Sequence, residues 1–521
     1  MHGSSSDAAF PASLNQERVL LARELTRRRN GAEAAPSHLR LGLRLRGPLD
    51  VHALGKTLNE IVRRHAALRV AFFPNLQLPP AEWEQRFSRF RRTGVFEPGL
   101  FQQLVLQHQD ISIQKIDLGE SGQEAAIEAT VRSEDRRPFD DGKFERMRAS
   151  LLRLGDHDHV LVLVLDHLVS DLWCLPLIGR EVRRLYACFA DSDCSLPADP
   201  PLSFPEFAMR EKLTAATGGF DRAVNYWRDQ WARFGSARVS LGDLRNSSAT
   251  PGAGSGAFPS VSLRFDESDS EKVRSLARNH RISLFTVFLA AFSVVLAKHT
   301  GRSVVAIWGH FANRTEPETR DMVGWLANSH ILGVDLSDNP RGDALLGQVQ
   351  RVVAGALSWQ ALPLSHLWRA LRCGPRFAGI TVLMDFNSLP RDLAEPRKSG
   401  GLEISPFILP QATTPRLSLL GVHVLDEGNR LSVTARFPKS KFKPESIAGL
   451  IEELKHVALK LALRSGARAF ELAGIAPTSL GATREENEMD EFVVLDATLI
   501  PEAAEPCEES KDEPTIPAPF V

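Results

Sequence analysis

Residues 159–173 read HVLVLVLDHLVSDLW, and the expected fold is built outward from this stretch. Val and Leu alternate without a polar residue between them, which is typical of a buried β-strand. The strand gives way to Asp166 and His167, and Asp171 follows four residues after the His. A His at a strand end can move protons near neutral pH. With 15 His in the chain, a bare H-x-x-x-D is expected by chance about once, so the surrounding segments must decide.

The composition is that of an ordinary folded protein, with 43% apolar and 24% charged residues. A chain of 521 residues exceeds one average domain, which predicts two lobes. No apolar run reaches the roughly 20 residues of a membrane span, and the first residues lack the pattern of a signal peptide. We therefore expect a cytoplasmic protein without a membrane or nucleic-acid partner.

The five cysteines are odd in number and lack C-x-x-C spacing. This pattern supports neither a disulfide framework nor a zinc site, so we expect no metal and buried, reduced thiols. Net charge is unevenly divided. From Arg484 onward, twelve acidic and two basic residues give −10, which leaves +9 for the rest because the whole chain carries −1. This division predicts an acidic partner, or a tail that folds back over the basic body.

Hydrophobic periodicity divides the chain into three parts. Residues 1–200 and 201–473 each alternate strands with amphipathic helices, which predicts two α/β lobes, each a mixed sheet covered by helices. The expected strands include residues 38–46, 146–153, 159–165, 261–265, 303–308, 380–387 and 431–437; the expected helices include residues 13–28, 51–65, 123–135, 220–234, 284–300, 341–356 and 444–464. Residues 246–259 predict a mobile loop, and residues 474–521 a disordered acidic tail.

Several segments, taken in order, resemble the condensation domains of nonribosomal peptide synthetases over about residues 13–464. SLNQERVLL resembles the opening motif of that family, and RRHAALRVAFF resembles its R-H-E-x-L-R-T-x-F, with Arg69 at the second Arg. DHLVSDL resembles H-H-x-x-x-D-G, with His167 as the second His and Asp171 as the Asp. The segment ANRTEPETRDMVGWLANS resembles the longest motif of the second lobe and contains Asn328.

The chain departs from the family pattern at three positions. Asp166 stands where the family has its first His, Leu172 where it has Gly, and Gly333 where an Arg usually follows the Asn segment. The second His is the one that the family treats as catalytically important, so the resemblance keeps His167. Leu172 is expected to narrow the channel or to change how the next helix begins, because Gly tolerates backbone geometries that Leu does not.

The resemblance implies a V-shaped pseudo-dimer of two chloramphenicol acetyltransferase-like lobes, with the active His in a tunnel between them. A phosphopantetheine arm of an acyl or peptidyl carrier protein would deliver a thioester from one face, and a small amine or alcohol acceptor would enter from the other. No cofactor would be bound permanently. His167 Nε2 would accept or orient the proton of the acceptor, a role typically worth about 10²–10⁴-fold in rate.

The resemblance also assigns supporting residues. Asp171 would hold the loop by pairing with an Arg, and Arg69 is the expected partner. Asp166 either points away from His167, as strand alternation suggests, or raises the working pH by favouring the protonated ring. Leu172, Trp173 and Asn328 are candidates for lining the tunnel, although core packing is the alternative for Trp173 and for Trp325.

Three functions remain open at this point. The leading one is a free-standing condensation enzyme that forms amides or esters in natural-product biosynthesis, because neither an adenylation segment nor a carrier attachment motif is found in the chain. The second is a degenerate member that binds a carrier or synthetase without catalysis, and the third is a coenzyme A-dependent acyltransferase of the same fold. The apolar island FVVLDATLI, from Phe492 to Ile500, either docks on a partner or packs on the body as an extra strand.

Overall fold

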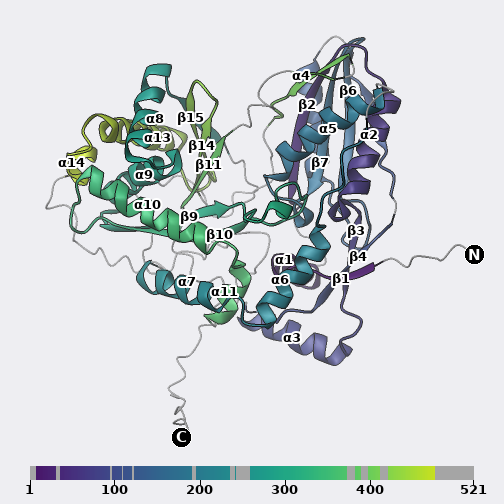
Figure 1. Ribbon diagram of the computed structural model, residues 1–521, viewed down its shortest axis with the longest axis horizontal. Coiled ribbons are helices and arrows are strands. Elements are labelled where there is room, and N and C mark those ends of the chain that lie inside the picture. The colour runs from purple at the N-terminus through teal and green to yellow at the C-terminus, as the bar shows by residue number, and fades with distance from the viewer. Residues whose placement is uncertain are drawn as a thin grey trace, which may run out of the picture.

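The computed structural model describes residues 8–475 except 31–35, 94, 96, 108, 120–121, 191–194, 235–240, 242–243, 245–258, 372–381, 389–396, 400 and 411–419. Two lobes diverge from a shared base, and each contains a six-stranded sheet with helices packed on it (Figure 1). The prediction of two α/β lobes is confirmed. Residues 246–258 of the predicted loop and residues 476–521 of the predicted tail, with Phe492 and Ile500, lie outside the described residues.

Strand β7 (Asp158–Asp166) forms the centre of the first lobe. Its Leu side chains pack on one face of the sheet against helices α2 (Val51–Arg64) and α5 (Cys174–Ala190). Its Val side chains pack on the other face against helix α4 (Gln123–Arg136). Because successive side chains of a strand point to opposite faces, a strand covered on both sides has no position for a polar residue.

The first sheet has the strand order β12-β13-β2-β7-β6-β5. Its strands are β2 (His38–Arg46), β5 (Ile113–Asp117), β6 (Met147–Gly155), β12 (Arg397–Ser399) and β13 (Leu402–Pro406), besides β7. Strand β13 runs antiparallel to β2. The second half of the chain therefore supplies two strands to the first lobe, and the predicted division near residue 200 stays a prediction.

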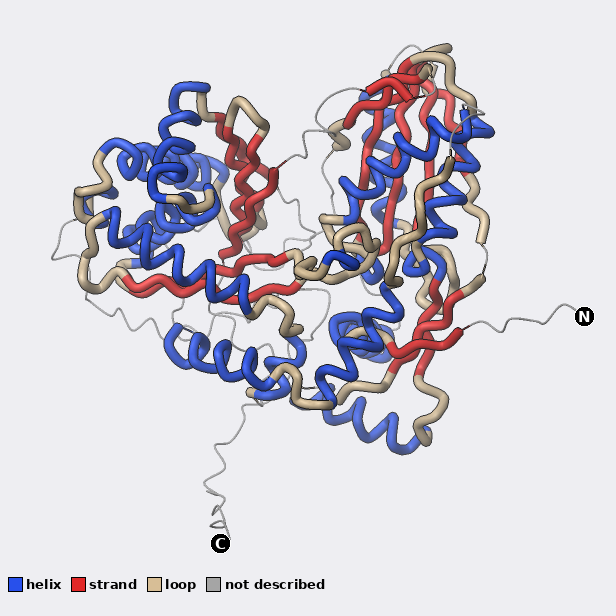
Figure 2. Tube along the Cα trace, in the orientation of Figure 1, coloured by secondary structure: helices blue, strands red, loops and turns tan. Residues whose placement is uncertain are grey.

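The second sheet has the order β10-β9-β11-β14-β15-β8. Its strands are β8 (Ser260–Arg264), β9 (Val304–Phe311), β10 (Asn328–Asp335), β11 (Val382–Ser388), β14 (Leu420–Asp426) and β15 (Leu431–Arg436). Helices α8 (Glu267–His280), α9 (Leu284–Thr300), α10 (Gly342–Ser358) and α13 (Pro444–Leu463) lie on one side of it (Figure 2).

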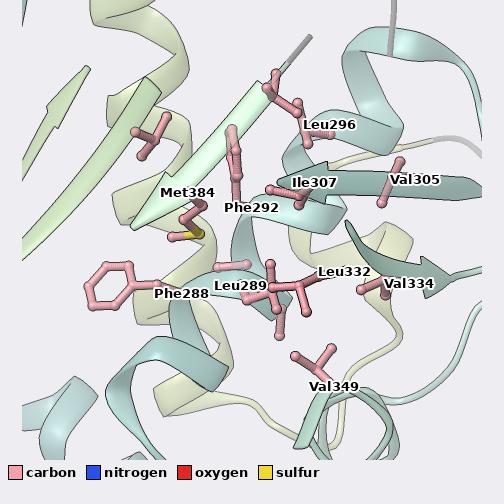
Figure 3. Packing of buried hydrophobic residues seen from close by; sticks show 14 of the residues in the cluster. Phe288, Leu289, Phe292, Leu296, Val305, Ile307, Leu332, Val334, Val349 and Met384 are labelled. Carbon is pink, nitrogen blue, oxygen red and sulfur yellow. The ribbon is translucent and has the colours of Figure 1, made fainter. Parts of the chain in front are cut away.

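Helix α9 is apolar around most of its circumference because it is enclosed by the sheet and by the other helices. Phe288, Phe292 and Leu296 are fully buried there, against Ile307 of β9 and Met384 of β11 (Figure 3). In the part of the chain that the structure describes, no single helix has both the length and the composition of a membrane span; α8 and α9 meet those criteria only together, across a bend of 106°.

The base joins the lobes. It contains a small sheet of β1 (Ala8–Pro11), β4 (Phe101–Val105) and β3 (Val70–Pro74), together with α1 (Leu14–Asn30), α3 (Pro80–Thr93), α6 (Phe204–Ala216), α7 (Asp221–Phe234) and α11 (Leu364–Ala370). Asn15 of α1 donates a hydrogen bond of 3.0 Å to Asn328 of β10. Helix α14 (Ala469–Ala473) closes the described part of the chain.

One cysteine departs from the expectation of reduced thiols. Cys188 is disulfide-bonded, whereas Cys174 is a free, buried thiol. The sequence argument failed for Cys188 because it considered only C-x-x-C spacing and residue number, and a pairing depends on which thiols the fold brings together.

Candidate functional site

His167 begins a single 3₁₀ turn (His167–Val169) at the end of β7. Its main-chain N–H donates to the carbonyl oxygen of Ser37 at 3.1 Å, and its side chain is partly buried. The imidazole lies edge-on to the indole of Trp325, with ring centroids 5.3 Å apart. Since Trp325 belongs to the second half of the chain, the ring of His167 lies where the two lobes meet.

Asp166 is a buried carboxylate that stabilises this turn. It accepts hydrogen bonds from Arg146 Nη1 at 2.8 Å and from the N–H of Leu168 at 3.0 Å, and Arg23 lies 3.6 Å away. Burial by itself raises the pKa of Asp166, but Arg23, Arg146 and the Leu168 N–H outweigh it and hold the pKa below its usual value. The carboxylate is thus directed to cations and to the main chain of the turn.

Arg146 is fully buried and extends the same network. Its guanidinium also donates to the carbonyl oxygens of Val70, Asp141 and Lys143 at 2.7–2.8 Å. Gln16 of α1 donates to the carbonyl of Leu168 at 3.0 Å. The turn that presents His167 is therefore held from three places: Arg146, helix α1 and Ser37.

Asp171 pairs with Arg314, which lies in the loop between β9 and β10 that reaches the first lobe (Figure 2). The Oδ2 atom accepts from Arg314 Nη1 at 2.9 Å and from the N–H groups of Leu326 and Ala327 at 3.0 Å each. Both charged side chains are at most 4% exposed. This ion pair connects the two lobes four residues after His167.

The predicted pairing of Asp171 with Arg69 is wrong. Arg69 instead donates to the carbonyl oxygens of Leu106 and Arg63, and it stabilises the first lobe alone. The resemblance pointed to Arg69, whereas the actual partner comes from the other lobe. The motif around Ala312 contained Arg314, but the sequence did not show that its side chain crosses to the first lobe.

The local conformation of the second-lobe motif explains how Arg314 reaches Asp171. Asn313 has a left-handed backbone, with φ of 51°, which Asn tolerates better than most residues. Its N–H donates to Gln360 at 3.0 Å. Gly324 packs against Phe204 so closely that a Cβ atom there would lie 2.2 Å from the ring. Position 324 thus requires Gly, and position 313 favours a residue such as Asn that tolerates a left-handed backbone.

Cys174 fills the space beside the ion pair. Its sulfur lies 3.5 Å from Asp171 Oδ1, 3.4 Å from the Gly324 carbonyl and 3.6 Å from Arg314 Nη2. Burial raises the pKa of this thiol to about 12, so the sulfur stays protonated and can donate. Sequence reasoning did not identify Cys174 or Arg146, because neither stands in a recognisable spacing.

The three residues predicted to line a tunnel have different surroundings. Leu172 and Trp173 are about half exposed, and the guanidinium of Arg314 lies 5.9 Å from the centroid of the Trp173 ring. Asn328 is 3% exposed; its amide nitrogen donates to the Gln360 carbonyl, and its oxygen accepts from Asn15. Leu172 does not have the left-handed backbone that would require Gly. The tunnel role stays a prediction for all three.

Gly333 departs from the family pattern for a steric reason. A Cβ atom at this position would lie 2.1 Å from Cγ of Phe234 in α7. The ring of Phe234 therefore occupies the space that an Arg side chain would need. Among the described residues, no group of three or more His, Cys, Asp or Glu is placed to hold a metal ion.

Comparison with known families matches residues 89–469 to the model of the condensation domain. A linear gramicidin synthase protein of Brevibacillus parabrevis is 26% identical over 456 residues, which is 86% of this chain and 8% of that protein. Malpinin synthetase of Mortierella alpina is 28% identical over 408 residues, which is 77% of this chain and 5% of that protein. The chain thus spans less than a tenth of these relatives.

Solved structures show the same fold at low identity. The X-domain from teicoplanin biosynthesis has a TM-score of 0.72 and 18% identity, covering 90% of this chain and 98% of the X-domain. The first condensation domain of the CDA synthetase has a TM-score of 0.69 and 17% identity, covering 90% and 99%. SgcC5 from Streptomyces globisporus has a TM-score of 0.66 and 20% identity, covering 88% and 100%.

Proposed function

The chain belongs to the condensation-domain family, which forms amide and ester bonds in nonribosomal peptide synthesis, and on this premise we propose that it joins a carrier-bound acyl group to an amine or hydroxyl acceptor. The proposed donor is a thioester on the phosphopantetheine arm of a carrier protein. The position of His167 carries the proposal, because a partly buried imidazole at the meeting point of both lobes can contact substrates that enter between them.

In the proposed reaction, Nε2 of His167 accepts the proton from the acceptor N–H or O–H as the nucleophile attacks the thioester carbonyl. The C–N or C–O bond forms, the C–S bond breaks, and the departing thiolate takes up the proton. General-base help of this kind typically contributes about 10²–10⁴-fold. Trp325 packs against the ring and limits its rotation.

Asp166 and Asp171 act as positioning residues in this proposal. Asp166 holds the turn through Arg146 and the N–H of Leu168, at the place where the family has its first His. Asp171 holds the second lobe through Arg314. The loss of the first His is therefore compensated by a carboxylate network that stabilises the same turn.

A non-catalytic binding role is the second candidate. A teicoplanin X-domain of similar fold has been solved in complex with OxyB, and the replacements at Asp166, Leu172 and Gly333 also favour this reading. A coenzyme A-dependent transfer would use the same His167 with a different donor. The free-standing organisation and the cytoplasmic location stay predictions.

Intact-mass spectrometry of an acyl-loaded carrier protein tests the proposed function. Wild type should transfer the acyl group to members of an amine and alcohol panel, and His167→Ala should reduce the rate by at least about 10²-fold. His157→Ala is the matched control, because His157 is exposed in the turn before the same strand. Coenzyme A thioesters are assayed in parallel. Absence of transfer by wild type, or equal transfer by His167→Ala, refutes the proposal.

A further inference from the structure

Trp325 lies in the segment that leads into β10, and its side chain is partly buried between two buried neighbours. The indole packs on the apolar cluster of the base, which also contains Leu168 and Val169 of the 3₁₀ turn. The same indole is in edge-on contact with the imidazole of His167. An indole from the second half of the chain thus packs on the cluster that holds this turn and touches the ring that the turn presents.

The hydrogen bonds of the turn fix its main chain. Ser37 accepts from the N–H of His167, and Asp166 accepts from the N–H of Leu168. The direction of the imidazole depends in addition on rotation about its Cα–Cβ and Cβ–Cγ bonds, and the second of these rotations is broad for His. Contact with the ring itself therefore limits where Nε2 points. The indole of Trp325 makes such a contact, with ring centroids 5.3 Å apart.

On the N-terminal side of Trp325, the main chain is held by the interlobe ion pair and by the thiol beside it. Arg314 Nη2 donates to the carbonyl oxygens of Met322 and Gly324 at 3.3 and 3.4 Å. The N–H of Gly324 donates to the sulfur of Cys174 at 3.5 Å. The main chain therefore reaches Trp325 from a fixed direction.

On the C-terminal side, the N–H groups of Leu326 and Ala327 both donate to Oδ2 of Asp171 at 3.0 Å. Asp171 belongs to the first lobe, so these bonds attach the segment to the lobe that carries His167. Trp325 lies between the two sets of bonds. A change in how the second lobe docks on the ion pair would therefore displace the main chain of Trp325, and with it the indole that contacts the imidazole.

We propose that Trp325 is a positioning residue through which the docking of the second lobe orients the imidazole of His167. The ion pair of Asp171 and Arg314 holds the main chain of Trp325, and the indole holds the ring. The effect on rate rests on the proposed acyl transfer, in which Nε2 accepts a proton, whereas the orientation of the ring does not depend on that reaction.

Two apolar replacements separate a role toward the ring from a role in packing. Trp325→Leu keeps an apolar side chain on the base but removes the aromatic ring, whereas Trp325→Phe keeps a ring. Trp83→Leu is the matched control, because Trp83 belongs to the same base cluster and stacks on Phe87. If Trp325→Leu does not fold, Trp325→Met replaces it, since the flexible Met side chain fills irregular space.

Nuclear magnetic relaxation of the imidazole carbons, in the full chain with isotope-labelled His, measures how well the ring of His167 is ordered. His167→Gln assigns its signals among the 15 His. Trp325→Leu should lower the order parameter of this ring, whereas Trp325→Phe and Trp83→Leu should keep it. Arg314→Gln should lower it in the wild-type background and cause no further fall in Trp325→Leu, because both changes act along one route.

The acyl-transfer assay adds a kinetic measurement. The kcat of Trp325→Leu should fall about 2–10-fold, the usual contribution of one aromatic pair. KM should change less, because the indole acts on the imidazole rather than on the bound acceptor. Trp325→Phe should recover most of the lost rate, and Trp83→Leu should keep it.

The outcomes separate this role from the proposed function. Unchanged order of the His167 ring in Trp325→Leu overturns the positioning role, and so does an equal loss of order in Trp83→Leu. An Arg314→Gln effect of the same size with and without Trp325 also overturns it. Loss of ring order in Trp325→Leu alone, without acyl transfer by wild type to any acceptor, supports the positioning role while the proposed function fails.

Discussion

Asp171 and Arg314 form a buried ion pair, and we expect the free energy of unfolding to fall by different amounts when one or the other is replaced. At 2.9 Å the Coulomb attraction is about 6 kcal/mol for an effective dielectric constant of about 20, and desolvation offsets part of it. Removing one member of a buried pair typically costs about 3–5 kcal/mol, because the other charge stays buried. The two replacements differ in how well the remaining charge is compensated.

Arg314→Gln leaves Asp171 with three main-chain donors, from Leu326, Ala327 and Trp173. The free energy of unfolding should therefore fall by about 3 kcal/mol, the lower end of the range for a broken buried pair. Asp171→Asn leaves the guanidinium with carbonyl contacts of 3.2–3.4 Å and removes an acceptor that receives three donors on one oxygen. The free energy of unfolding of this variant should fall by about 5 kcal/mol, the upper end of the same range.

Urea-induced unfolding of the full chain, followed by tryptophan fluorescence, measures both losses. The exposed pair of Arg464 and Glu471 is the control, and its removal should change the free energy of unfolding by about 0–1 kcal/mol. A loss below about 1 kcal/mol for Asp171→Asn, or a larger loss for Arg314→Gln than for Asp171→Asn, contradicts the reasoning.

Two further predictions concern the base and the second lobe. Burial raises the pKa of Glu211 from 4.5 to about 7, so its neutral form stabilises the fold below pH 4.5 and this contribution, about 3 kcal/mol, is lost as pH rises to 7. The free energy of unfolding of Glu211→Gln, measured between pH 4.5 and 7.5, should not show this decline. A pH dependence equal to that of wild type would contradict the assignment of the decline to Glu211. Gly333→Ala should lower the free energy of unfolding by about 1–3 kcal/mol through contact with Phe234. The same replacement in a Phe234→Leu background should lower the free energy of unfolding by less, and thermal unfolding of wild type, both single variants and the double variant measures the difference.

Local patterns predicted most of the elements of the fold. Residues 38–46 and 284–300 coincide with β2 and α9, because alternation and capping are properties of neighbouring residues. Strand β10 was not predicted, since NSHILGVD mixes polar and apolar positions within a buried strand. The pairing of β13 with β2 was also missed, because it joins segments more than 350 residues apart.

The candidate site was predicted only in part. The order of motifs identified His167 and Asp171, but the partner of Asp171 had to be chosen among 63 Lys and Arg residues. That choice depends on how the lobes dock, which no local pattern encodes. The approach of His310 and His423 to Asp385 was not predicted for the same reason, since these residues come from three strands far apart in the chain.

The insertion of β13 beside β2 also sets the order in which the molecule can be completed during translation. The helices and inner strands of the first lobe have all been synthesised by Ala190, yet the edge of β2 is paired only after Pro406 has emerged. At 5–20 residues per second, this interval is roughly 10–40 s. During that time the nascent chain presents an open strand edge, of the kind that recruits other strands and chaperones.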